Sequence, residues 1–383
     1  MVMSRNQIVL IIFLISLTVL VFFAQKSFQH MNYFVPLADA ILHGRIDVSQ
    51  TGAMNELVPY AGKWFVVYPP MPALAVLPFV LIWGLGFNQV IASILFAAAA
   101  IALFFILTTK FTKKIWVGLA LTALFGFGTN FFYTSLIGSS WYIAHVLAVF
   151  FLICALLMSI NQKPSLSGMF LSFAFLSRLP TILAFPVLLY FLLSKSKTRF
   201  KTLLWFALPI VSAIIIFALY DYLRFGSITQ TGYSLIPGVL QEPWYKEGIF
   251  NLSYIPRQLS VLFLAFPKIT GDFPYFLPSS VGMALWITTP ALLLLFLVKF
   301  KDKALKWFLL TALLVAFPSL IHGTVGFTQF GYRFSLDYIL FLLLPLAFVF
   351  ERLGKLWTWI FVSISIAVNL WVVILFYLKI FST

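Results

Sequence analysis

The acidic residues of this chain carry the most chemical information, because there are so few of them. The sequence has 383 residues, of which only 10 are Asp or Glu while 25 are Lys or Arg. Three of the acids, Asp39, Asp47 and Glu56, follow the first apolar run of the chain. Asp39 stands among apolar residues, where burial near lipid raises the basicity of a carboxylate. We therefore take Asp39 as a candidate functional residue.

A short amphipathic helix is predicted around Asp39. The apolar residues at positions 34, 37, 38, 41 and 42 recur at helical spacing. Gly44 is a typical residue for the end of such a helix. A helix with one apolar face lies on a membrane surface, and the alternative for Asp39 is a polar face that points to water.

Four of the cationic residues outside the basic clusters of the chain are candidates for contact with an anion. They are Lys63, Arg178, Arg257 and Arg333. Arg is well suited to phosphate because its planar guanidinium donates two parallel hydrogen bonds. Lys63 precedes an aromatic stretch that is typical of a membrane interface, so a lysine that extends its charge to the interface is the alternative there.

Further polar residues are candidates for contact with a substrate. Glu242 begins an aromatic and charged stretch, 242–247, of a kind that grips sugars or lipid headgroups. His145 and His322 lie near the predicted ends of apolar runs, where a packing role is the alternative. Asp337 follows Arg333 by four residues and is expected to pair with it or orient it. The predicted substrate-binding residues are Lys63, Tyr68, His145, Arg178, Glu242, Arg257, His322, Gln329, Tyr332, Arg333 and Asp337.

Composition indicates that membrane helices carry these residues. Hydrophobic residues make up 62% of the chain and charged residues 9%, whereas soluble domains have roughly 25% charged residues. A soluble protein of this composition would expose apolar surface and precipitate, which excludes a soluble enzyme. The composition also excludes a disordered chain, and the single Cys154 excludes an internal disulfide and a cysteine metal cluster.

The apolar runs predict an all-α polytopic membrane protein of about eleven transmembrane helices. A segment with four prolines, 69–86, is predicted as a re-entrant or interfacial helix because Pro interrupts helices. The predicted spans are 7–24, 90–109, 115–131, 141–160, 166–177, 179–193, 203–223, 281–298, 305–321, 336–350 and 356–377.

The charges predict the orientation of these spans. Five compact loops carry most of the Lys and Arg, and loops of that kind lie in the cytoplasm. The net charge of +15 is therefore read as a topology signal and not as a sign of nucleic-acid binding. The chain is predicted to be one domain, 1–383, of the plasma membrane. Its outer face carries a catalytic loop, 25–70, a substrate loop, 224–280, and the segment 322–335.

Five stretches together resemble a known superfamily. Residues 33–47 read Tyr-x-x-x-Leu-Ala-Asp-Ala-x-x-x-Gly-Arg-x-Asp, and residues 62–74 read Gly-Lys-Trp-x-x-x-Tyr-Pro-Pro-x-Pro-Ala-Leu. The stretches 141–145, 176–180 and 329–337 follow in order. This arrangement resembles the integral-membrane glycosyltransferases of the GT-C fold. It is similar to their bacterial branch near the protein O-mannosyltransferases and the aminoarabinose transferase of lipid A.

The resemblance implies a reaction and a role for the singled-out residues. It implies transfer of a sugar from a polyprenyl-phosphate donor on the outer face of the membrane, with Asp39 as general base and cationic residues at the leaving phosphate. The sequence departs from the mannosyltransferases at Ala40, where those enzymes have a second acid. The acceptor therefore stays open between a glycan, a lipid and a protein. No Asp-x-Asp pair occurs, so no metal ligands and no cofactor are predicted, although a divalent metal is left open.

Two other functions compete with this hypothesis. A transporter or flippase of a lipid-linked or small polar substrate would place its functional charges near the middle of the membrane and use paired broken helices. A lipid-linked polysaccharide polymerase or ligase would share the donor and the membrane face, so only analysis of the product separates it. The sugar, and whether the reaction inverts or retains its configuration, are open from the sequence.

Overall fold

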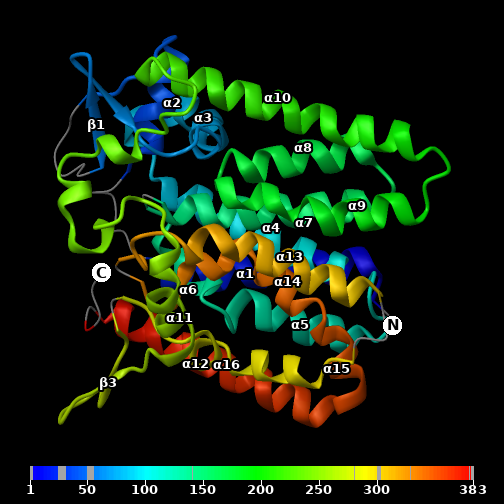
Figure 1. Ribbon diagram of the computed structural model, residues 1–383. Helices are drawn as coiled ribbons and strands as arrows, with labels where there is room; N and C mark the ends of the chain where they lie inside the picture. The colour runs from blue at the N-terminus through cyan, green and yellow to red at the C-terminus, as the bar shows by residue number, and fades with distance from the viewer. Residues whose placement is uncertain are drawn as a thin grey trace.

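The computed structural model describes residues 3–24, 32–49, 56–139, 141–279, 281–299, 303–327, 329–378 and 380. In this part of the chain sixteen α-helices run mainly side by side, with two small two-stranded sheets at one end (Figure 1). Residues 25–31 and 50–55 of the predicted catalytic loop, and residue 280 of the predicted substrate loop, lie outside the described residues.

Five of the described helices are long and apolar enough to cross a membrane. They correspond to the predicted spans 7–24, 90–109, 141–160, 203–223 and 356–377. A sixth span results if two helices that meet at an angle of 47° are counted together, α5 (Ile115–Phe127) and α6 (Phe131–Ile137). The five helices fit an all-α protein embedded in a membrane. They are α1 (Arg5–Phe23), α4 (Gln89–Thr108), α7 (Tyr142–Ile160), α10 (Arg199–Phe225) and α16 (Lys355–Tyr377).

The predicted number of about eleven spanning helices is wrong for the described chain, because several apolar runs are interrupted or short. Proline breaks a helix by removing a hydrogen-bond donor and by steric conflict with the preceding turn. Pro180, Pro290 and Pro345 each stand at or beside the start of an element within a predicted span. The resulting elements are α8 (Pro164–Phe175), η3 (Leu179–Ala184), α9 (Phe185–Ser194), α12 (Leu285–Thr288), η8 (Pro290–Leu297), α13 (Lys303–Leu320), η9 (Arg333–Asp337), α14 (Ile339–Leu343) and α15 (Leu346–Leu353).

Helix α7 forms the inside of the bundle, where it packs against α4 and α8. In its most apolar stretch 83% of the residues are buried, compared with 11% in α1 and in α10. Helices α1 and α10 therefore present their apolar side chains outward, as helices that face lipid do. Helix α8 approaches α10 closely at Gly168, where an added Cβ would lie only 2.2 Å from the carbonyl oxygen of Phe206.

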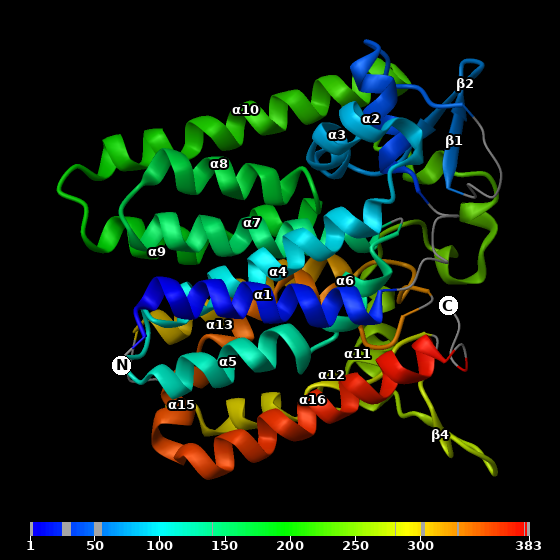
Figure 2. The same cartoon turned by 180° about the vertical axis from the view of Figure 1, so that it is seen from behind.

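The basic loops gather at one end of the bundle, which we call the basic end. Lys110 Nζ donates to Asn161 Oδ1 at 3.1 Å, which joins the α4–α5 loop to the α7–α8 loop. Lys114 Nζ lies 3.4 Å from the carbonyl oxygen of Glu351 in α15. Figure 2 shows the N-terminus and the loop between α9 and α10 at this same end. The loops that the sequence predicts on one side of a membrane thus lie together.

The opposite end, which we call the loop end, carries the irregular segments (Figures 1 and 2). Among them is an antiparallel hairpin in which Leu57 pairs with Val66. The elements at this end are α2 (Phe34–Leu42), β1 (Leu57–Tyr60), β2 (Lys63–Val66), α3 (Met71–Trp83), η2 (Gly84–Gly86), η4 (Tyr233–Leu235), η5 (Val239–Gln241), η6 (Pro243–Tyr245), η7 (Leu252–Tyr254), α11 (Ile255–Leu264), β3 (Lys268–Ile269) and β4 (Phe276–Leu277).

Two of these elements bear on the predictions for the first loop. Helix α3 stays at the loop end: the N–H of Met71 donates to Leu176 O at 3.0 Å, and Gln89 Nε2, at the start of the following helix α4, donates to Gly138 O at 2.8 Å. Helix α2 packs its apolar face on α3. Gly44 follows α2 with a φ of +70°, a conformation that suits the end of a helix.

Candidate active site

Asp337 joins three parts of the chain at the loop end. It ends η9 and is fully buried. Its Oδ2 accepts from Arg178 Nη2 at 3.0 Å and from Arg178 Nε at 3.3 Å, and its Oδ1 lies 2.9 Å from His145 Nδ1. The carboxylate therefore holds the α8–η3 turn and the start of α7 against η9. It also sets the direction in which the Arg178 guanidinium points.

The expected pairing of Asp337 with Arg333 is wrong, because the ion pair is with Arg178. Both Asp337 and Arg333 belong to η9, which is a 3-10 helix. Such a helix has three residues per turn, so side chains four residues apart point to different sides. In an α-helix the same spacing would have placed the two on one face.

Arg333 is a buried cation in an aromatic surround. Its side chain is nearly inaccessible, and its guanidinium carbon lies 4.7 Å from the ring centre of Trp141 and 5.3 Å from that of Phe334. Nη1 donates to the carbonyl oxygen of Phe327 at 2.7 Å. No carboxylate of the described residues forms an ion pair with Arg333. Within the described residues the guanidinium contacts ring faces and one carbonyl oxygen, and the Glu56 carboxyl group acts on it electrostatically without forming an ion pair.

Two hydrogen-bond donors beside this cation have no acceptor within the described chain. Arg333 Nε is buried and unbonded, and so is Trp141 Nε1. A buried donor without an acceptor costs free energy, so such groups mark a place where a ligand can supply acceptor atoms. Arg178 lies against the same Phe334 ring at 5.5 Å. We call Arg178 and Arg333 the arginine pair.

Three amide and hydroxyl side chains hold η9 in position. Tyr332 Oη donates to Gln258 Oε1 at 2.9 Å, and Gln258 Nε2 donates to His322 O at 2.7 Å and to Thr324 O at 2.9 Å. Gln329 Oε1 accepts from the Arg333 N–H at 3.1 Å. Gln329 and Tyr332, which the sequence predicts to bind substrate, thus have positioning contacts. Gln258 was not predicted, since a lone Gln in a sequence carries no signal of its partners.

An aromatic cluster borders the arginine pair, and we call it the aromatic wall: Tyr233, Tyr245, His322 and Phe334. The ring centre of His322 lies 5.7 Å from those of Tyr233 and Tyr245 and 6.0 Å from that of Phe334. Burial lowers the pKa of His322 to about 4, so its ring is neutral at pH 7. Flat neutral rings of this kind can pack against the apolar face of a sugar.

The predicted residues Glu242 and Arg257 lie at the outer margin of the aromatic wall. Glu242 Oε2 accepts from Trp244 Nε1 at 2.7 Å. Arg257 Nη2 donates to the Trp244 carbonyl at 3.3 Å, and its guanidinium lies over the ring of Tyr254 at 5.2 Å. Both charged groups therefore fix the loop that carries η6.

Residues of the first loop reach this region through Tyr68. Its ring centre lies 5.7 Å from that of Tyr33 and 6.4 Å from that of Trp141, which itself covers Arg333. Lys63 lies at the turn of the β1–β2 hairpin, where its Nζ is 3.1 Å from Asp47 Oδ1 and its side chain is largely exposed. Lys63 is thus engaged with a carboxylate of its own loop.

Asp39 lies on α2 with its side chain 26% exposed. Its Oδ2 is 3.8 Å from His43 Nδ1, one turn further along the chain. Within the described residues it forms no ion pair and no hydrogen bond with the arginine pair. The predicted base and the predicted phosphate ligands are therefore not joined by a direct contact.

The structure adds Glu56 to the candidate site. The sequence did not predict a catalytic or substrate-binding role for this carboxylate. Its Oε2 is buried and has no hydrogen-bond partner in the described chain. Burial raises the pKa of Glu56 from its ordinary value of 4.5 to about 8; the positive charge of Arg333 opposes this rise and Glu242 adds to it. The only hint in the sequence is that Glu56 directly precedes two apolar residues, Leu57 and Val58, which are buried in the structure.

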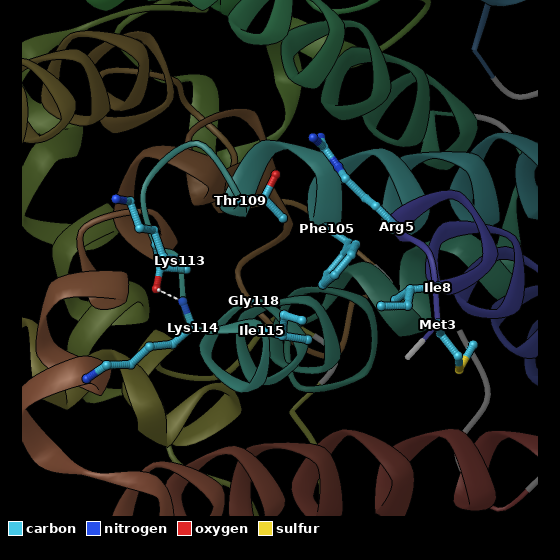
Figure 3. A pocket seen from close by; sticks show the side chains of 10 residues that line it. Met3, Arg5, Ile8, Phe105, Thr109, Lys113, Lys114, Ile115 and Gly118 are labelled. Carbon is cyan, nitrogen blue, oxygen red and sulfur yellow. Dashed lines mark hydrogen bonds between the residues drawn. The ribbon is translucent and has the colours of Figure 1, made fainter. Parts of the chain in front are cut away.

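A separate pocket of about 310 Å³ lies at the basic end, near Arg5, Lys113 and Lys114 (Figure 3). In Figure 3 both lysine side chains extend away from Arg5, so the three cations do not converge on one point. This pocket belongs to the end of the bundle opposite the arginine pair.

The chain matches no protein-family model, no curated protein and no solved structure. Within the described ranges, no group of three or more His, Cys, Asp or Glu residues could hold a metal ion.

Proposed function

We propose that this protein is a membrane glycosyltransferase of the GT-C type, which moves a sugar from a polyprenyl-phosphate donor to an acceptor on the outer face of the plasma membrane. The resemblance of five sequence stretches to that superfamily supports this function. The loop end is then the outer face, because the basic loops gather at the other end.

The observation that carries the proposal is the arginine pair. Among the residues that the structure describes, Arg333 is buried without a carboxylate partner, and its Nε and Trp141 Nε1 lack acceptors. A lipid phosphate supplies both the negative charge and the acceptor oxygens. The Asp337 carboxylate holds Arg178, so that cation is already in place when a phosphate arrives.

Each part of the site then has a task in the transfer. The acceptor attacks the anomeric carbon of the sugar while the bond from that carbon to the phosphate oxygen breaks. The arginine pair stabilises the negative charge on the leaving phosphate. The aromatic wall offers ring faces to the sugar, and a first-loop carboxylate receives the proton of the acceptor, the role that the sequence predicts for Asp39.

The test uses the purified full-length protein in lipid nanodiscs. Binding of polyprenyl phosphate is measured by native mass spectrometry. Turnover is measured with polyprenyl-phosphate hexoses and pentoses that carry radiolabel in the sugar, as label that leaves the lipid for water or for an added acceptor. We expect Arg333→Gln to weaken polyprenyl-phosphate binding at least about tenfold, since it removes charge-assisted hydrogen bonds worth about 1.5–3 kcal/mol.

Arg45→Gln is the matched control, because Arg45 lies at the same end, is half exposed and pairs only loosely with Asp47, at 3.5 Å. It should bind polyprenyl phosphate as the wild type does. A wild-type protein that neither binds polyprenyl phosphate nor releases labelled sugar from any donor would contradict the proposed function. So would an Arg333→Gln variant whose affinity is unchanged.

A further inference from the structure

The position of Glu56 is fixed by structure on both sides. Its backbone N–H donates to Tyr33 Oη at 3.3 Å, which ties it to the start of α2. On its other side, β1 begins at Leu57, which is buried and pairs with Val66. The carbonyl of Val66 accepts from Arg224 Nη1 at 2.6 Å, so the hairpin is anchored to the end of α10.

The Glu56 side chain faces the groups of the candidate site. The charges that act on it most are those of Arg333 in η9 and Glu242 before η6. Its own charge acts in turn on Tyr33, Tyr233 and Tyr245. The charged and phenolic groups coupled to this carboxyl group thus belong to three parts of the chain: the start of α2, the 233–245 segment and η9. Its Oε2 has no partner among them.

Asp39 differs from Glu56 in each of these respects. Its carboxylate is 26% exposed and has His43 of the same helix as its neighbour. In the described structure neither the arginine pair nor the aromatic wall contacts it. A general base has to reach the proton that it removes, directly or through one water molecule, and of the two carboxylates Glu56 is the one whose buried oxygen lacks a partner in the described chain and whose charge is coupled to that of Arg333.

We propose that Glu56 is the catalytic base of the transfer and that its Oε2 takes the proton of the acceptor. This inference rests on the proposed function. The acceptor oxygen forms a bond to the anomeric carbon, and the bond from that carbon to the phosphate oxygen breaks. The phosphate leaves with the electron pair and is held by the arginine pair. The hydroxyl proton passes to Glu56, which later releases it to water.

The electrostatic surroundings of Glu56 agree with this role. Burial raises its pKa to about 8, and a general base works best when its pKa is near the working pH. The ionised fraction of Glu56 then grows as the pH rises toward 8. The groups that face it are Arg333, Glu242 and the hydroxyls of Tyr33, Tyr233 and Tyr245, so a change of pH near 8 acts first on Glu56 itself.

The experiment compares Glu56→Gln, Glu56→Asp and Asp39→Asn in nanodiscs with the labelled donors described above. We expect Glu56→Gln to lower turnover about 100-fold or more, the size of a lost general base, while binding of polyprenyl phosphate is retained. The wild-type rate should rise with pH toward about 8, and Glu56→Gln should lose that rise. Glu56→Asp should restore part of the turnover, and Asp39→Asn should keep the wild-type pH profile.

Glu351→Gln makes the same chemical change in α15 at the basic end, opposite the candidate site, and should leave the transfer unaltered. Full turnover in Glu56→Gln, or a pH profile that flattens in Asp39→Asn and not in Glu56→Gln, would overturn the assignment of Glu56 while leaving the glycosyltransferase in place. A wild type with neither binding nor turnover would instead remove the proposed function and this assignment together.

Discussion

Arg178 and Asp337 lie 159 residues apart in the sequence and form an ion pair at 3.0 Å, in which Asp337 is fully buried and Arg178 is largely buried. The same carboxylate is 2.9 Å from His145. One acid thus holds two parts of the chain that would otherwise bury polar groups without partners. This arrangement leads to the first prediction.

Asp337→Asn should destabilise the protein by about 3–5 kcal/mol, because it leaves the Arg178 charge in a buried place without its partner. Thermal unfolding in detergent measures this change. Asp47→Asn is the control, since Asp47 pairs with the exposed Lys63 and an exposed pair contributes at most about 1 kcal/mol. Equal losses in the two variants would show that the buried pair adds nothing beyond a surface pair.

Trp141→Phe should weaken the binding of polyprenyl phosphate by about three- to tenfold, the effect of one lost hydrogen bond of about 0.5–1.5 kcal/mol. The substitution keeps an aromatic ring over Arg333 but removes the Nε1–H group that lacks an acceptor in the described chain. Trp83→Phe, at an exposed position of α3, is the control and should bind normally. If both variants bind as the wild type does, Trp141 does not donate to the ligand.

The stability of the protein should fall as the pH rises from about 5 to about 8. The pKa of Glu56 is raised from 4.5 in the unfolded chain to about 8 by burial, so the folded state binds more protons than the unfolded state in this range. Stability therefore decreases with pH until Glu56 is ionised in both states. Glu56→Gln should remove this part of the decline. The midpoint of thermal unfolding is measured for both proteins between pH 5 and 9. The difference between the two midpoints should widen up to about pH 8 and then stay constant.

Gly168→Ala should destabilise the packing of α8 on α10. An added Cβ would lie 2.2 Å from Phe206 O, which is backbone and cannot rotate away. Overpacking of this kind costs about 1–3 kcal/mol, and small residues allow helices in membranes to approach each other. Gly86→Ala is the control, because nothing lies within 4 Å of its added Cβ. Identical unfolding midpoints for the two variants would contradict the close contact.

Local features of the loop end were largely predictable, because they depend on neighbours in the sequence. The apolar spacing around Asp39 predicts the helix that forms α2, and Gly44 ends it as expected. The turn at Arg178 and the prolines before α3 also appear where the sequence indicates them. The number of long helices was overestimated, since hydropathy alone does not show where proline and 3-10 segments divide an apolar run.

The partners of the charged residues were not predictable in the same way. The residue type predicts that Arg333 and Arg178 bind an anion, but the partner of Asp337 is set by the three-residue turn of η9. The environment of Glu56 depends on Arg333, which is far away in the sequence. The residues next to Glu56 in the sequence do not show that Arg333 acts on it in the folded chain.

Composition and spacing therefore establish that this chain is a helical protein with apolar spans, that its basic loops belong together, and which few charged residues are worth testing. These properties follow from free energies of transfer and from helical periodicity, both of which act residue by residue. Which carboxylate faces the arginine pair is a property of the folded chain. Burial and charge act through space, so the raised pKa of Glu56 and the exposure of Asp39 exist only after distant segments have packed together.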